Sequence, residues 1–399
     1  MARFSTKIPA EIERKIQEYV NNPTETDWRQ PGNRKELFLR YFAWRVSHED
    51  LDQRHWMRTV CKDYDLERRL WFSMVFGMTY RTCQAWSYTE TFPYINDMDM
   101  VALEDWHVKN WKRTTYGSDA RYNKGFFVRQ CQSVKDWIGT GTLTDKINSI
   151  IVYDDQPSNF YALFEEIKSL YKFGRMTTWL AMQALHDVGN LPIDPGTPIL
   201  NGYGPHNDSS MQSIWNGLCA LENKPDKMVG KYGKYKPTPK EVDWFQKSIE
   251  DYCEQGQEYL GEKVDSYRCE TIWCMYKRLF NENASKEYPG HSSGDHAQWY
   301  LYYRENWPEI DWSKYRLAAR TLPGSICGKQ IVSWRNAVFG RTGMMVNMHD
   351  MFDDMPNVDS ILGVDPEDGH LTQFWEDDSL IIPTDRYTYE FTLSPPVLQ

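Results

Sequence analysis

Residues 169–194 read SLYKFGRMTTWLAMQALHDVGNLPID, and this stretch decides the fold that we expect for the chain. Its pattern predicts a helix, a tight hairpin centred on Gly174, and a second helix through Met182 and Leu185. A glycine permits so sharp a turn because it has no Cβ. Asp194 follows the second helix after a short loop. The stretch therefore predicts two helices joined by a turn, with an acidic residue placed shortly beyond them.

Helical spacing of apolar residues continues on both sides of this stretch. No alternation of strands and helices is found, which argues against a doubly wound nucleotide-binding sheet. We predict a mostly α fold with an N-terminal helical region (1–140), a region with the hairpin and further helices (141–339) that packs with the first as one unit, and an acidic tail (340–399). The expected helices cover residues 9–21, 36–46, 65–93, 97–110, 127–139, 158–170, 240–280, 312–320 and 328–338.

The formal net charge of -10 is unevenly distributed along the chain. Residues 1–339 carry 44 Lys and Arg and 44 Asp and Glu, whereas residues 340–399 carry 2 and 12. The neutral part can therefore carry a local basic face for nucleic acid. Most of the 17 Trp and 25 Tyr side chains are expected to fill the core, and a minority could stack on bases.

Motifs of several other classes are absent from the sequence. There is no GxxxxGK[ST] loop, no GxGxxG, no HExxH and no zinc-deaminase HxE…PCxxC pattern, so a P-loop kinase and a zinc deaminase are disfavoured. We predict neither a metal nor another cofactor, although the carboxylate of Asp119 could bind Mg²⁺. The eight cysteines form no CxxC pair, which is typical of reduced thiols. No apolar stretch approaches transmembrane length, so no membrane partner is expected.

The stretch 169–194 resembles the helix-hairpin-helix element of DNA glycosylases. In that element the backbone N–H groups at the start of the second helix face a DNA phosphate. A catalytic Asp follows the hairpin in those enzymes, and Asp194 stands at a matching separation. The glycosylase pattern has two glycines around one apolar residue, but this chain has Lys172-Phe173-Gly174, so Lys replaces one glycine. The resemblance implies a helical architecture like that of the glycosylases.

A second resemblance is to phage enzymes of thymidine hypermodification. The absent P-loop decides against their kinases and favours the amino acid:DNA transferases, also called α-glutamyl/putrescinyl thymine pyrophosphorylases. The resemblance covers about residues 35–300. The segments that carry it are GRMTTWLAMQALHDVGNLPID (174–194), GYGPHNDSSMQSIWNGL (202–218), LFLRYFAWRVSHEDLD (37–52), LERRLWFSMVFGMTYRTCQAWSYTETFP (66–93), NWKRTTYGSDARYNKGF (110–126) and CETIWCMYKRLF (269–280).

Such an enzyme transfers an amino acid or polyamine onto 5-pyrophosphoryloxymethyluracil in DNA and releases pyrophosphate. The resemblance implies as partners double-stranded DNA with modified uracil, and free glycine, serine or a polyamine. It also implies the cytoplasm of an infected bacterium. A helix-hairpin-helix glycosylase and a non-catalytic DNA-binding protein are the alternatives.

The implied reaction needs an anchor for DNA and a site for the leaving pyrophosphate. The alternative for the DNA anchor is an ordinary joint between two helices. The alternative for the pyrophosphate site is a solvated basic loop. The predicted DNA-binding residues are Gly174, Arg175, Thr177 and Thr178. The predicted pyrophosphate-binding residues are Lys112, Arg113, Arg121 and Lys124, whose cationic donors suit an anion.

The attacking nucleophile must lose a proton, and a carboxylate can accept it. Asp194 and Asp187 are the candidate bases. The alternative for Asp194 is a turn-forming role, and the alternative for Asp187 is a helix C-terminal or structural acid. Cys274 could add transiently to C6 of the uracil, since Glu270 and Lys277 would lie on neighbouring turns of the same helix. A buried structural thiol is the alternative for Cys274.

Further residues are candidates for the base and substrate pocket. Tyr80 and Gln84, taken as one helical turn apart, could contact the edge of the target base. His206 and Asp208 lie in the GYGPHND loop and could contact either substrate. Lys277 completes the predicted pocket. The sequence does not name the nucleophile.

Overall fold

A computed structural model gives the arrangement of the chain. Every regular element that it describes is a helix, which confirms the predicted mostly α fold. None of these helices has the length and apolar character needed to cross a membrane. The described residues are 10–21, 30–47, 53–116, 123–198, 217–219, 221–222, 238–276, 302–312 and 341.

The chain forms two compact units, and each is built from segments that are separated in the sequence. Unit 1 comprises Met1–Asp52, Thr197–Asp295 and Ala319–Phe391. Unit 2 comprises Gln53–Gly196, His296–Ala318 and Thr392–Gln399. The three-part division predicted from the sequence stays a prediction, and the acidic tail lies, apart from Arg341, outside the described residues.

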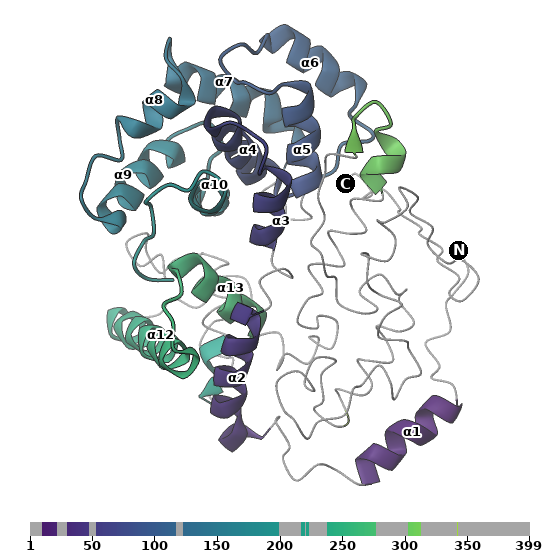
Figure 1. Cartoon of the computed structure of the whole chain (residues 1–399), viewed down its shortest axis with the longest axis vertical. Helices are drawn as coiled ribbons and strands as arrows, with labels where there is room; N and C mark the ends of the chain where they lie inside the picture. The colour runs from purple at the N-terminus through teal and green to yellow at the C-terminus, as the bar shows by residue number, and fades with distance from the viewer. Residues whose placement is uncertain are drawn as a thin grey trace. The chain divides into compact units, whose positions relative to one another are not determined.

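The core of unit 2 is built around α4 (Leu66–Thr79) and α10 (Arg175–Asp187), which pack against each other. Gly77 lets the two helices approach closely, because a Cβ there would lie 2.7 Å from the Cβ of Ala181 and 2.9 Å from the carbonyl oxygen of Thr177. In Figure 1, α10 is seen end-on, and it also contacts α3 (Gln53–Val60) and α9 (Gln156–Lys168). This packing fixes both ends of α10, where several predicted site residues lie.

The single helix predicted over residues 65–93 is wrong. The structure has two helices there, α4 and α5 (Thr82–Thr91). Tyr80 ends α4 in the left-handed conformation at φ 52°, and Arg81 is extended at φ -143°. No glycine or proline stands at the break. Both helices are almost wholly buried, so the run of apolar residues continues across the break and hides it in the sequence.

The remaining helices of unit 2 lie around this core. The predictions for residues 97–110, 127–139 and 158–170 are confirmed to within a few residues by α6 (Met100–Lys109), α7 (Phe127–Ile138) and α9. Two further helices, α3 and α8 (Leu143–Asn148), were not predicted. Two helix termini have clear sequence signals. The side chain of Asp99 caps the start of α6, and Gly139, at φ 69°, ends α7. Unit 2 also contains η3 (Lys124–Phe126).

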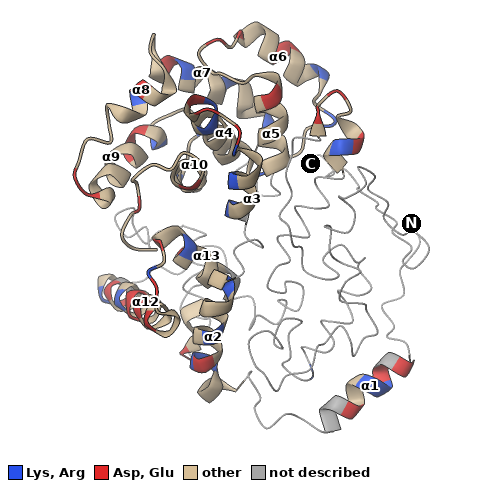
Figure 2. Cartoon of the chain, in the orientation of Figure 1, with Lys and Arg blue, Asp and Glu red and all other residues tan. Residues whose placement is uncertain are grey.

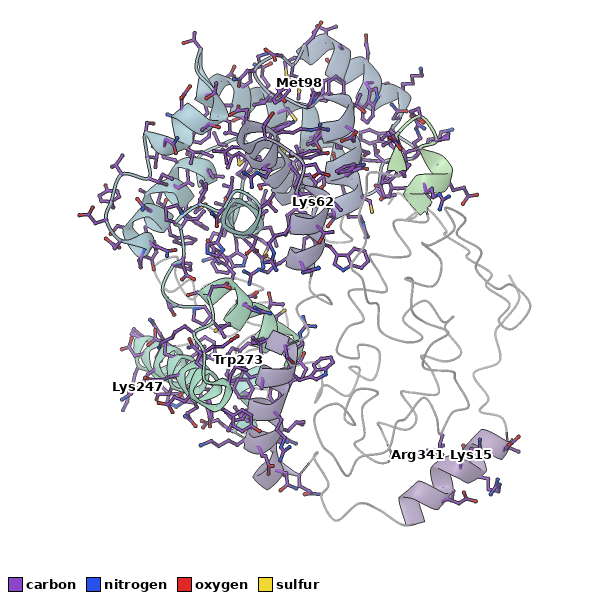
Figure 3. All side chains as sticks on the ribbon, viewed as in Figure 1. Lys15, Lys62, Met98, Lys247, Trp273 and Arg341 are labelled. Atoms are coloured by element: carbon purple, nitrogen blue, oxygen red, sulfur yellow. The ribbon has the colours of Figure 1, made fainter. Side chains whose placement is uncertain are left out.

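In unit 1, α2 (Arg34–Ser47) packs against α12 (Pro239–Leu260) and α13 (Ser266–Tyr276). Aromatic rings fill the space between them: the ring centroids of Phe38 and Trp273 are 4.4 Å apart. Trp273 is labelled in Figure 3. Gly256 makes room for Phe42, because a Cβ there would lie 2.7 Å from the phenylalanine ring. This unit also contains α1 (Ala10–Asn21) and η1 (Pro31–Asn33).

Candidate functional site

The turn between α9 and α10 lies where the hairpin was predicted. Its left-handed residue is Lys172 at φ 58°, and Gly174 is extended at φ -73° and ψ 172°. The prediction that Gly174 itself makes the sharp turn is therefore wrong. Lys172 occupies the position of the glycine that the glycosylase pattern has and this chain lacks. The assignment to the helix-hairpin-helix motif, and its contact with DNA, stay predictions.

The four residues predicted to bind DNA differ in accessibility. Gly174 is exposed and Arg175 half-buried, whereas Thr177 and Thr178 are buried. Gly174 starts α10 without any side-chain cap. The hairpin can therefore offer a phosphate the backbone N–H groups of the first helical turn and the Arg175 side chain, but not the threonine hydroxyls.

The predicted pyrophosphate site is only partly described. Arg113 forms an ion pair with Glu309, donates to the carbonyl oxygen of Asn306 at 2.8 Å, and stacks over Trp307 at 3.9 Å. Lys124 donates to the carbonyl oxygen of Trp111 at 2.5 Å, and burial lowers its pKa.

These partners tie Arg113 and Lys124 into the fold. Lys112 is exposed, and Arg121 and Asp119 lie outside the described residues. Of the four predicted pyrophosphate-binding side chains, Lys112 is thus the described one that is most accessible to an anion.

A buried hydrogen-bonded chain links Tyr116, Tyr88, His107 and Lys124, and sequence reasoning missed it. The Nε2 of His107 is 2.9 Å from the carbonyl oxygen of Lys124, which can only accept, so Nε2 carries the proton. Burial lowers the pKa of His107, and the neutral Nδ1 accepts from the hydroxyl of Tyr88 at 2.6 Å. Tyr88 in turn accepts from the hydroxyl of Tyr116 at 3.1 Å. The chain thereby connects the hydroxyl of Tyr116 with the backbone carbonyl of Lys124.

Gln84 belongs to a second buried network. Its Oε1 accepts from the hydroxyl of Tyr303 at 2.7 Å and from the N–H of Thr115 at 2.9 Å, while its Nε2 donates to Ser87 at 2.8 Å. The amide is therefore satisfied within the fold. The expectation that Tyr80 and Gln84 share one helix is wrong, because the break between α4 and α5 separates them. Tyr80 is 39% exposed and remains accessible to a ligand.

Asp187 lies at the end of α10 in a buried ion pair. Two nitrogens of Arg54 donate to its two oxygens, each at 2.5 Å, and His186 lies 3.2 Å away. Burial raises the pKa of Asp187, but attraction to Arg54 and hydrogen bonds from His186 and Arg54 outweigh it, and the pKa falls to about 2. Arg54 comes from α3, which carries arginines and no acidic residue (Figure 2). This geometry favours the structural alternative for Asp187.

Asp194 lies in the loop beyond α10. Its Oδ1 accepts from the N–H of Gly196 at 2.7 Å, and its own N–H donates to Gln156 at 3.1 Å. Gly196 has φ 75°, so the segment turns sharply here. The side chain is half-buried and stabilises this turn. Its role as a base stays a prediction.

Glu270 and Cys274 lie one turn apart on α13 of unit 1. Glu270 is buried and Cys274 half-buried. Their predicted placement on one helix is confirmed, and their chemical roles stay predictions. His206, Asp208 and Lys277 lie outside the described residues.

Comparison with known proteins adds to this geometry. A family described as "Amino acid:DNA transferase" matches residues 40–285, which is more than half of the chain. A protein of Salmonella phage ViI named "Serinyltransferase" is 24% identical over 356 residues, covering 81% of this chain and 84% of the relative. No solved structure matches the chain.

Proposed function

The chain belongs to the amino acid:DNA transferase family, and on this premise we propose that it joins a free amino acid to 5-pyrophosphoryloxymethyluracil in DNA and releases pyrophosphate. The observation that carries the proposal is the family match over residues 40–285. The matched range includes the basic segment, the turn before α10, and α13. It favours a transferase over the glycosylase and the non-catalytic DNA-binding protein.

The proposed chemistry is a displacement at the methylene carbon attached to C5 of the uracil. A lone pair of the amino acid forms a bond to this carbon, and the carbon–oxygen bond to pyrophosphate breaks, so that pyrophosphate leaves with the electron pair. The nucleophile gives its proton to a base. Cationic side chains lower the cost of the charge that develops on pyrophosphate. The target base leaves the stack so that its substituent reaches the site.

Two described side chains suit these roles better than the other candidates. Lys112 is exposed, whereas Arg113 and Lys124 bind protein groups. Asp194 is half-buried, whereas Asp187 is buried and both of its oxygens accept from Arg54. We therefore propose that Lys112 contacts pyrophosphate and that Asp194 accepts the proton. From the sequence pattern alone, and independently of where the two units lie, we also propose that Cys274 and Glu270 on α13 act on the uracil ring.

Serine is the first amino acid to test, because a relative that covers most of the chain is named a serinyltransferase. Glycine and polyamines are the other candidates. The organism of that relative also supports a place of action in the cytoplasm of an infected bacterium, where phage DNA is copied.

The test uses DNA that contains 5-pyrophosphoryloxymethyluracil, incubated with the full chain and with single amino acids or putrescine. Nucleosides are then identified by mass spectrometry. The proposal is supported by a nucleoside with the mass of deoxyuridine that carries serine on a methylene group at C5. Free base or abasic sites would instead indicate a glycosylase. Bound but unchanged DNA with every nucleophile would reject the transfer proposal.

A further inference from the structure

The start of α7 and the turn before α10 pack together at one corner of unit 2, which we call the α7–turn corner: Phe126, Arg129, Tyr171 and Lys172. The rings of Phe126 and Tyr171 meet edge to face, with centroids 6.2 Å apart. The N–H of Tyr171 donates to the hydroxyl of Ser133 at 2.9 Å. These contacts fix two segments, distant in sequence, as one surface.

The two cations of this corner are exposed and are held over the rings. The guanidinium carbon of Arg129 lies 4.2 Å from the centroid of Tyr171, and the Lys172 amine lies 5.1 Å from that of Phe126. Neither cation has an ion-pair partner in the part of the chain that the structure describes. Both charges are thus available to an anion, and the rings restrict their motion before it binds.

The two sequence windows that form the corner are rich in cations. Residues 123–135 and 167–186 together carry six Lys and Arg and no Asp or Glu, although the chain as a whole is acidic. The cations are Lys124, Arg129, Lys135, Lys168, Lys172 and Arg175. Lys168 pairs with Glu165, and Lys135 donates to the carbonyl oxygens of Asn96 and Met98. Arg129 and Lys172 have no such partner among the described residues, so these two cations suit a polyanion best.

Lys172 gives a second argument. Its φ of 58° is left-handed, a conformation that glycine adopts without the steric cost that a Cβ brings. The turn would therefore be more stable with glycine. What lysine adds at this position is its charged side chain, which points to a binding role for the amine.

We propose that Arg129 and Lys172, held over Tyr171 and Phe126, contact two phosphates of the DNA backbone when the substrate duplex binds. The inference rests on DNA being the substrate of the proposed function, and not on which base or amino acid reacts. It extends the interface from the first turn of α10 to the start of α7. Contacts of this kind position the duplex and carry no base specificity.

The experiment measures binding of the full chain to unmodified duplex DNA over a series of salt concentrations. Each lost phosphate contact makes the slope of log K against log salt shallower by about 0.9. Arg129→Ala/Lys172→Ala should therefore make it shallower by about 1.8. Lys62→Ala/Lys146→Ala is the matched control: it also removes two charges from unit 2, and Lys146 likewise lies over a ring, 5.3 Å from the centroid of Trp137. The control should keep the slope.

Lys172→Gly separates binding from folding. The variant should melt at a higher temperature than the unaltered chain and yet lose about 0.9 of the slope. A stabilised Lys172→Gly variant with unchanged binding, or a double variant with the original slope, would overturn the proposal. So would the absence of DNA binding by the unaltered chain. The binding assay uses DNA without an activated base and does not require amino acid transfer. A failure of the proposed transfer reaction would therefore not change how the binding result is interpreted.

Discussion

The buried ion pair between Arg54 and Asp187 allows a decisive test of whether Asp187 is a structural residue or a base. The side chains are 5% and 2% exposed. Asp187→Asn removes the negative charge and leaves the guanidinium of Arg54 buried without its counter-ion. Arg54→Met/Asp187→Leu replaces both partners by apolar side chains. A structural role predicts that the first variant is unstable and that the second regains stability.

The magnitude follows from the pKa of Asp187. A shift from 3.8 to about 2 corresponds to about 2 kcal/mol of stabilisation by the ionised carboxylate at neutral pH. Because the folded-state pKa lies below the ordinary value, this contribution is present above about pH 4 and is lost as the pH falls toward 2. Leaving Arg54 buried and unpaired raises the total cost to about 3–5 kcal/mol.

Thermal unfolding of the purified full chain measures this effect. A cost of about 3–5 kcal/mol lowers Tm by about 6–20 °C for a unit of this size. The double variant should recover most of the loss and should still transfer an amino acid. Unchanged stability of Asp187→Asn would refute the ion-pair argument. A stable double variant without transfer activity would show that Asp187 is needed for the chemistry after all.

The remaining predictions concern the core, the buried network and the candidate base. Gly77→Ala should destabilise the chain by about 1–3 kcal/mol, since its Cβ would lie 2.7 Å from that of Ala181; an unchanged Tm would contradict the close packing of α4 on α10. Tyr88→Phe should cost about 1–3 kcal/mol in urea unfolding, because His107 loses its donor and Tyr116 its acceptor; a cost near zero would disprove the inferred chain. Asp194→Asn keeps an oxygen for the N–H of Gly196 but removes a base, so transfer should fall by about 100-fold or more with Tm preserved. Transfer at the original rate would assign Asp194 to the turn alone.

Much of the helical framework could be predicted from the sequence, because helices with one buried face leave a clear period. Thr142 and Asp145 form a capping box that marks α8, so this helix could also have been found. The break at Tyr80 could not, since both flanking helices are buried and no breaker residue stands there. The left-handed Lys172 was equally hidden, because the pattern pointed to the glycine two residues later.

The candidate site was less predictable because its partners come from distant segments. Arg113 was expected to bind an anion from its basic surroundings, but Glu309, almost two hundred residues away, pairs with it. Gln84 similarly meets Tyr303. Local pattern contains no information on such pairs. It did place Glu270 and Cys274 on one helix, because that prediction needs only helical spacing.

The central claim, amino acid transfer with loss of pyrophosphate, is tested most directly by the stoichiometry of one reaction. Radiolabelled serine is supplied with DNA containing 5-pyrophosphoryloxymethyluracil, and both the label bound to DNA and the released pyrophosphate are counted. The account predicts that one pyrophosphate appears for each serine bound, and that DNA with unactivated 5-hydroxymethyluracil gives neither product. Serine bound to the unactivated DNA, or pyrophosphate released while no amino acid or amine becomes attached, would contradict it.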